Sequence, residues 1–159
     1  MAGTAKPSVG KKVPPFTATS TAGEDFTSAS ARGKALVLYF YPKDATSGCT
    51  VEAQEFRDLA DKFRKAGAII LGISRDTLKS HAKFRDKESL PFHLLSDPDE
   101  TLCRLFDVIR EKSLYGRKYM GIERSTFLID DKGVLRHEWR KVKVAGHAQE
   151  VLEVLRSLD

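Results

Sequence analysis

The sequence has little cysteine and no long apolar run. Two cysteines in 159 residues are too few for a framework of disulfide bonds, and they suit a reducing compartment. No apolar stretch approaches the roughly 20 residues that cross a membrane. Residues 1–15 contain Lys, Gly and Pro but lack the apolar segment of a secretory signal. These absences predict a cytoplasmic protein without a membrane partner.

Motifs for metals and cofactors are also missing. The four histidines show no His-x-x-x-His or mixed Cys/His spacing of the kind that metal sites use: they are His81, His93, His137 and His147. The chain contains no Gly-rich phosphate loop and no Gly-x-Ser-x-Gly turn. We therefore expect neither a metal nor a cofactor.

The net charge of +5 invites a nucleic-acid interpretation, but the basic residues do not form one block. They are scattered over residues 11–12, 110–118 and 136–143, and none of these segments carries a nucleic-acid-binding motif. We therefore expect no nucleic-acid partner. With 41% hydrophobic and 31% charged residues, the chain has an ordinary globular composition. Its length predicts a single domain over 1–159, with residues 1–8 mobile.

The pattern of apolar residues predicts an α/β fold with a central mixed sheet flanked by helices. Strands are expected at 16–19, 25–27, 35–41, 68–74, 92–95, 124–130 and 134–139, and helices at 50–65, 77–87, 100–106 and 147–158. The first two strands form an N-terminal β-hairpin extension. Residues 109–121 are charged and aromatic with two glycines, and we expect a long loop there.

Cys49 occupies a distinctive place in this pattern. It follows the buried strand 35–41 and stands at the first turn of the helix 50–65. Unpaired N–H groups and the helix dipole favour a thiolate at that position, and the thiolate is the nucleophilic form of cysteine. A buried, inert cysteine is the alternative interpretation.

The residues around Cys49 favour the reactive interpretation. Pro42 fixes the backbone of the loop, Thr46 places a hydroxyl three residues before the sulfur, and Gly48 allows close approach of other groups. Glu52 lies one helical turn beyond Cys49 and could orient a cation. A dithiol enzyme would need Cys-x-x-Cys at this junction, and here Thr46 replaces the first cysteine.

This spacing, Pro-x-x-x-Thr-x-x-Cys, resembles the active-site signature of the peroxiredoxins. The longer string Tyr-Pro-Lys-Asp-x-Thr-x-Gly-Cys-Thr-x-Glu resembles the branch named after bacterioferritin comigratory protein, or Q-type, and the likeness extends over roughly 9–158. The resemblance implies a thioredoxin-like fold. It also implies a thiol-dependent peroxidase that reduces hydrogen peroxide and organic hydroperoxides through a sulfenic acid at Cys49, in antioxidant defence.

The resemblance also assigns roles to several residues. The Thr46 hydroxyl, the Cys49 backbone N–H and the guanidinium of Arg124 would stabilise the departing oxygen, while Pro42 would cover the sulfur. Glu52 would orient Arg124. From composition alone, a surface residue at a strand end is the favoured interpretation of Arg124, and Glu52 could equally be a solvated helix residue.

Recycling is where the sequence departs from the family pattern. Gln54 and Arg85 stand where relatives carry a resolving cysteine. Cys103 is the remaining candidate, although its apolar neighbours favour a packing role. We therefore expect an external thiol to complete the cycle, such as thioredoxin or glutathione with glutaredoxin, and we expect a monomer.

Two other function classes remain open at this point. One is a binding or chaperone-like module with the same fold and weak catalysis, which the missing resolving cysteine would suit. The other is a thiol transferase, which would act on mixed disulfides without peroxide.

Overall fold

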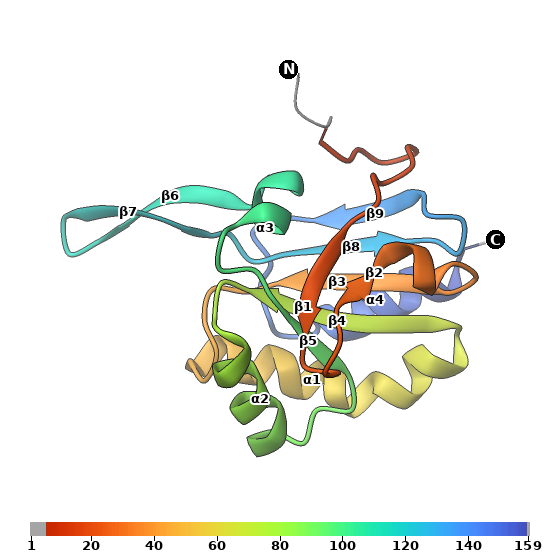
Figure 1. The fold of residues 1–159 in the computed structure, drawn as a ribbon, viewed down its shortest axis with the longest axis horizontal. Helices are drawn as coiled ribbons and strands as arrows, with labels where there is room; N and C mark the ends of the chain where they lie inside the picture. The colour runs from red at the N-terminus through yellow and green to blue at the C-terminus, as the bar shows by residue number, and fades with distance from the viewer. Residues whose placement is uncertain (1–5, 159) are drawn as a thin grey trace.

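The computed structural model describes residues 6–158 and contains a sheet of seven strands plus a separate two-stranded ribbon (Figure 1). The strands are β1 Thr17–Ser20, β2 Phe26–Thr27, β3 Ala35–Phe40, β4 Ala68–Ser74, β5 His93–Ser96, β6 Ile109–Leu114, β7 Arg117–Ile122, β8 Ser125–Ile129 and β9 Leu135–Trp139. The helices are the 3-10 turn η1 Ser28–Ala31 and the α-helices α1 Ser47–Lys65, α2 Leu78–Lys87, α3 Thr101–Leu105 and α4 His147–Arg156.

The seven-stranded sheet runs in the order β2-β1-β5-β4-β3-β8-β9. Strands β3, β4 and β5 are parallel, whereas β1, β2, β8 and β9 pair antiparallel with their neighbours. The sheet is therefore mixed, and its helices lie on both faces (Figure 1). This arrangement confirms the predicted fold class, including the N-terminal hairpin of β1 and β2.

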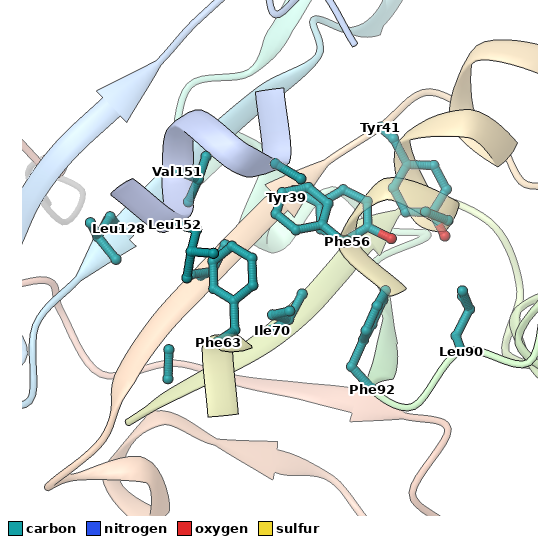
Figure 2. Close-up of a cluster of buried hydrophobic side chains, with 14 of the residues drawn as sticks. Tyr39, Tyr41, Phe56, Phe63, Ile70, Leu90, Phe92, Leu128, Val151 and Leu152 are labelled. Carbon is teal, nitrogen blue, oxygen red and sulfur yellow. The ribbon is translucent and has the colours of Figure 1, made fainter. Parts of the chain in front are cut away.

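Two hydrophobic clusters cover the two faces of the sheet, because successive side chains of a strand point in opposite directions. Val37 and Tyr39 of β3 pack with α1 and α4, and Figure 2 shows this cluster. Leu36, Leu38 and Phe40 of the same strand pack with α3 on the other face. Every residue of β3 is buried, as its unbroken apolar sequence predicts.

The expected helices and strands of the main sheet are present, with ends displaced by up to a few residues. The most useful difference concerns α1, which begins at Ser47 rather than near residue 50. Cys49 is therefore inside the first turn of the helix. Thr77 accepts a hydrogen bond from the backbone N–H of Ser80, as an N-terminal cap of α2 should.

The prediction of a loop at 109–121 is wrong. These residues form the β6–β7 hairpin, which projects from the body of the molecule (Figure 1). Its turn contains Tyr115 and Gly116, and both have positive φ angles, of 52° and 78°. Two such residues suit a tight hairpin turn of type I′. The ribbon was hard to recognise because most of its side chains face solvent, so no apolar alternation marks the strands.

The expected mobility of residues 1–8 falls largely on residues 1–5, which lie outside the described residues. At the start of the described chain, Lys6 forms an ion pair with Asp107 at 2.8 Å. Within residues 6–158, no helix has both the length and the apolar character needed to cross a membrane.

Candidate active site

The sulfur of Cys49 lies at the N-terminal end of α1, where the side chain is 2% exposed. The first hydrogen bond of the helix joins the backbone N–H of Thr50 to the carbonyl of Thr46. The N–H groups before Thr50 have no acceptor within the helix. They and the helix dipole provide positive potential around the sulfur, which favours the thiolate over the thiol.

Arg124 supplies a full positive charge at the same place. Its Nη2 donates a hydrogen bond to Cys49 Sγ at 3.4 Å. The two residues are 75 positions apart, and the sheet brings them together, because Ser125 of β8 pairs with Phe40 of β3. The segment that leads into β8 therefore meets the segment that leaves β3. A guanidinium donates from several N–H groups at once, so it can contact both a thiolate and a peroxide oxygen.

Gly48 leaves the space that the guanidinium occupies. A Cβ atom added at Gly48 would lie 3.3 Å from Arg124 Nη2. Such a contact is tight, so the guanidinium would have to shift if any side chain stood at position 48. The close approach expected at Gly48 from the sequence is therefore made by Arg124.

Glu52 holds the other side of the guanidinium. Arg124 Nη1 donates to Glu52 Oε1 at 2.6 Å, and the Glu52 side chain is 1% exposed. This bond fixes the plane of the guanidinium and leaves Nη2 for the sulfur. Burial lowers the pKa of Arg124, but the opposite effects of Glu52 and Cys49 outweigh it, so the guanidinium stays charged.

Burial has the larger effect on Glu52. It raises the pKa of this carboxyl group to about 7, although the Arg124 guanidinium acts in the lowering direction. Among the described residues, Glu52 Oε2 and the Tyr39 hydroxyl are buried side-chain oxygens without a hydrogen-bond partner. The guanidinium therefore bonds to one oxygen of Glu52. The carboxyl group is costly to ionise because its second oxygen is buried without a partner.

Thr46 and Pro42 lie in the loop between β3 and α1. Thr46 precedes the helix in an extended conformation, and its hydroxyl donates to the carbonyl of Lys43 at 2.8 Å. The hydroxyl thus closes the loop on itself in this structure, and its side chain is exposed. Pro42 is half-buried directly after the strand.

Cys103 lies apart from this group. It is 0% exposed in the cluster that α3 forms, on the face of the sheet opposite Cys49. Its backbone N–H donates to Asp97 at 2.8 Å. Burial and the neighbouring Asp97 raise the pKa of the Cys103 thiol well above its ordinary value, which keeps it protonated. Both cysteines are free thiols in the structure.

The sequence interpretation gave no role to Asp44 and weighed His81 only as a metal ligand. In the structure both are buried beside the active-site loop, and the Nδ1 atom of His81 lies 2.7 Å from Asp44 Oδ2. Two signals were available in the sequence. Asp44 belongs to the quoted motif, and His81 is three residues before the buried Phe84, on the same side of α2.

Comparisons with known proteins agree with this geometry. Residues 9–138 match the model of the AhpC/TSA family. The chain is 51% identical over 144 residues to a putative peroxiredoxin bcp of Coxiella burnetii, covering 91% of this chain and 95% of that protein. It is 47% identical over 151 residues to the peroxiredoxin Bcp of Bacillus subtilis, covering 95% of this chain and 96% of that protein.

Solved structures show the same likeness. A structure of Xanthomonas campestris peroxiredoxin Q superposes with a TM-score of 0.85 at 51% identity, covering 89% of this chain and 90% of that one. A cysteine-to-serine mutant of Xylella fastidiosa PrxQ gives a TM-score of 0.90 at 40% identity, covering 97% and 98%. The chain therefore belongs to the AhpC/TSA family, and within it to the peroxiredoxins of the Bcp or Q type, which have a thioredoxin-like fold and act as thiol peroxidases.

Proposed function

We propose that this peroxiredoxin reduces hydrogen peroxide and organic hydroperoxides by forming a sulfenic acid at Cys49. The observation that carries the proposal is the position of the Cys49 sulfur between the N-terminus of α1 and the Arg124 guanidinium, at 3.4 Å from Nη2. A Xanthomonas campestris relative in this branch is described as having alkyl peroxide reduction activity, which supports organic hydroperoxides as substrates.

In the first step the Cys49 thiolate attacks the terminal oxygen of a hydroperoxide, R–O–O–H. An S–O bond forms as the O–O bond breaks, leaving Cys49–SOH and RO⁻. The alkoxide takes a proton and departs as ROH, which is water when the substrate is hydrogen peroxide. Negative charge moves from sulfur to the leaving oxygen, so a donor that reaches both atoms lowers the barrier. Arg124 is that donor, and Glu52 holds it in place.

The N–H groups at the start of α1 and the Thr46 hydroxyl are the other donors near the reacting oxygens. The hydroxyl contacts Lys43 in this structure, and a rotation about its side-chain bond would turn it toward a bound peroxide. Pro42 shields the sulfur from bulk water. These two roles follow the resemblance to the family together with the position of the loop.

Recycling then needs a thiol from outside the chain. A thiol R′SH attacks the sulfenic sulfur, releasing water and leaving a mixed disulfide between Cys49 and R′. A second thiol displaces Cys49 and leaves as R′–S–S–R′. Thioredoxin and glutathione with glutaredoxin are reductants of the required chemistry. The separation of Cys103 from Cys49 by the sheet supports this route over an internal disulfide.

We also propose that the protein acts as a monomer in the cytoplasm. The two free cysteines fit a reducing compartment. Size-exclusion chromatography with light scattering at working concentration tests the first point, and cell fractionation tests the second.

Replacing Cys49 with Ser tests the assignment of the nucleophile. The variant should lose peroxide consumption with dithiothreitol as the reductant, whereas the matched Cys103→Ser variant should keep it. Multiple turnovers by the wild type would separate a peroxidase from a binding module. Retained turnover in the Cys49→Ser variant would overturn the proposal, and activity on mixed disulfides without peroxide would point to a thiol transferase.

A further inference from the structure

A buried hydrogen-bond network joins α2 to the loop that precedes the active-site helix. Its centre is the carboxylate of Asp44, whose side chain is buried in that loop. Oδ1 accepts a bond from the Tyr41 hydroxyl at 2.6 Å, and Oδ2 accepts one from the Ser80 hydroxyl at 2.8 Å. Oδ2 also faces His81 Nδ1 at 2.7 Å. Three side chains, two of them on α2, therefore converge on one residue of the loop.

The hydrogen-bond partners of His81 determine its charge. Nδ1 faces the Asp44 carboxylate, and Nε2 faces the backbone carbonyl of Leu95 at 2.9 Å. Both partners are acceptors, so both ring nitrogens must carry a hydrogen. His81 is therefore an imidazolium ion with no exposed surface, paired with a buried carboxylate. Burial acts to raise the pKa of Asp44, but the hydrogen bonds from His81, Tyr41 and Ser80 have a larger, lowering effect. The pKa is therefore below its ordinary value, and the carboxyl group stays ionised.

A hydrogen bond to Asp76 also anchors the backbone of the loop at Asp44. The N–H of Asp44 donates to Asp76 Oδ2 at 2.9 Å, and Asp76 follows the end of β4. The next residue, Ala45, has a positive φ of 63°, which is unfavourable for a residue with a Cβ atom. A strained loop of this kind persists only where surrounding contacts hold it. The anchors on Asp44 are those contacts.

Asp44, Asp76 and His81 also lie close enough together to suggest a metal site, with ligand atoms within 4.8 Å. The hydrogen bonds argue against it. A metal would need a free lone pair on one nitrogen of His81, and both nitrogens are already engaged as donors. The cluster is better explained as an ion pair within a hydrogen-bonded network.

We infer that His81 and Asp44 are positioning residues for the peroxidase reaction: their buried ion pair fixes the 42–46 loop over Cys49 without touching the sulfur. This inference rests on the proposed function. The loop carries Pro42 and Thr46, which the proposed function assigns to the peroxide, whereas Arg124 and the N-terminus of α1 contact or surround the sulfur itself. The ion pair should therefore affect the reaction with peroxide and leave thiolate formation alone.

The test measures two reactions of Cys49 in the reduced full-length protein. One is the second-order rate constant with hydrogen peroxide, and the other is the rate of alkylation by iodoacetamide as a function of pH. The variants are His81→Gln and Asp44→Asn, which remove the ion pair, and Ser80→Ala, which removes one neutral hydrogen bond and keeps the charges. His93→Gln is the matched control, because His93 bonds to Thr21 on the far side of β5.

We expect His81→Gln and Asp44→Asn to slow the peroxide reaction about ten- to a hundredfold, the size of a misplacement of reacting groups by ~1 Å. The alkylation profile should be unchanged. Ser80→Ala should slow the peroxide reaction about two- to tenfold, as expected for one neutral hydrogen bond, and the double variant should be no slower than the slower single one. The His93→Gln control should match the wild type.

Other results would overturn the inference. A peroxide rate constant in His81→Gln equal to that of the wild type would remove any positioning role. Equal losses of the peroxide and alkylation rates, with a changed near-ultraviolet circular dichroism spectrum, would make the pair purely structural. If His81→Gln does not fold, an unaltered peroxide rate in Asp44→Asn overturns the inference. A wild type that does not react with peroxide would instead contradict the proposed function.

Discussion

Cys49 and Cys103 lie in different hydrophobic clusters, one on each face of the central sheet. A disulfide requires Cα atoms within about 7 Å, so these residues could form one only if α1 or α3 left its place. We therefore predict that Cys103→Ser keeps the wild-type rate of peroxide consumption with dithiothreitol. A loss of turnover with a native circular dichroism spectrum would show that Cys103 takes part in the cycle.

Arg124 should contribute through the geometry of its donors as well as through its charge. We predict that Arg124→Lys lowers the rate constant for hydrogen peroxide about 10²- to 10³-fold, as expected when a preorganised donor to developing charge is removed. Lys keeps the charge but cannot contact Glu52 and Cys49 with two separate N–H groups. Stopped-flow measurement of Cys49 oxidation checks this. Near-wild-type rates in Arg124→Lys would mean that charge alone suffices.

Gly48→Ala should separate stability from activity. The new Cβ would lie 3.3 Å from Arg124 Nη2, so the guanidinium must shift from the position in which it contacts the sulfur. Position 48 is in the first turn of α1, where alanine is a better helix former than glycine by at most ~1 kcal/mol. The variant should be at least as stable as the wild type in urea unfolding and slower with peroxide. An unaltered peroxide rate would show that Arg124 tolerates the shift.

Glu52 should make the folded state less stable as pH rises. Its ordinary pKa of 4.5 is raised by burial to about 7, so the folded state holds this proton more tightly than the unfolded state does. The contribution is fully present below the unfolded value and is lost as pH rises through about 7. The free energy of unfolding of the wild type, relative to that of Glu52→Gln, should therefore fall by on the order of 3 kcal/mol as pH rises from 4.5 to about 7. Urea unfolding at several pH values measures it, and a constant difference would contradict the assignment.

His147 should act in the opposite direction. Burial lowers the pKa of His147 from 6.5 to about 4, and its Nε2 lies 2.8 Å from the Thr126 hydroxyl. A depressed pKa stabilises the fold above about pH 6.5, and that stabilisation is lost as pH falls through about 4. The stability of the wild type relative to His147→Gln should decrease over this range. Glu52 and His147 change the stability of the wild type in opposite directions over overlapping pH ranges, so their effects partly cancel. The Glu52→Gln variant therefore shows the effect of His147 alone, and His147→Gln shows that of Glu52.

Much of the main sheet was predictable because its strands carry continuous apolar runs. β3 and β4 could be located from these runs, and their pairing in parallel follows from the helix between them. The β6–β7 hairpin was missed because most of its side chains are exposed or half-buried, and only its base at Ile109 and Ile122 packs against the core. With so little buried surface, its strands leave no hydrophobic period in the sequence.

The active site also has a part that the sequence predicts and a part that it does not. The turn that carries Cys49 is local in sequence, so its place at a helix N-terminus could be predicted from residues 35–63. The contact between Arg124 and Glu52 spans 72 positions and depends on the register of β8 against β3. The charge of His81 was beyond prediction, since it follows from which atoms face its two nitrogens.

The most direct test of the account is the intact mass of the reduced protein after one equivalent of hydrogen peroxide, measured beside the Cys103→Ser and Cys49→Ser variants. We predict the gain of one oxygen in the wild type and in Cys103→Ser, with no change in Cys49→Ser, because Cys49 forms a sulfenic acid that Cys103 cannot reach. Loss of two hydrogens in the wild type, replaced by gain of one oxygen in Cys103→Ser, would contradict the one-cysteine cycle. Gain of one oxygen in Cys49→Ser would contradict the central claim that Cys49 is the peroxide-reactive residue.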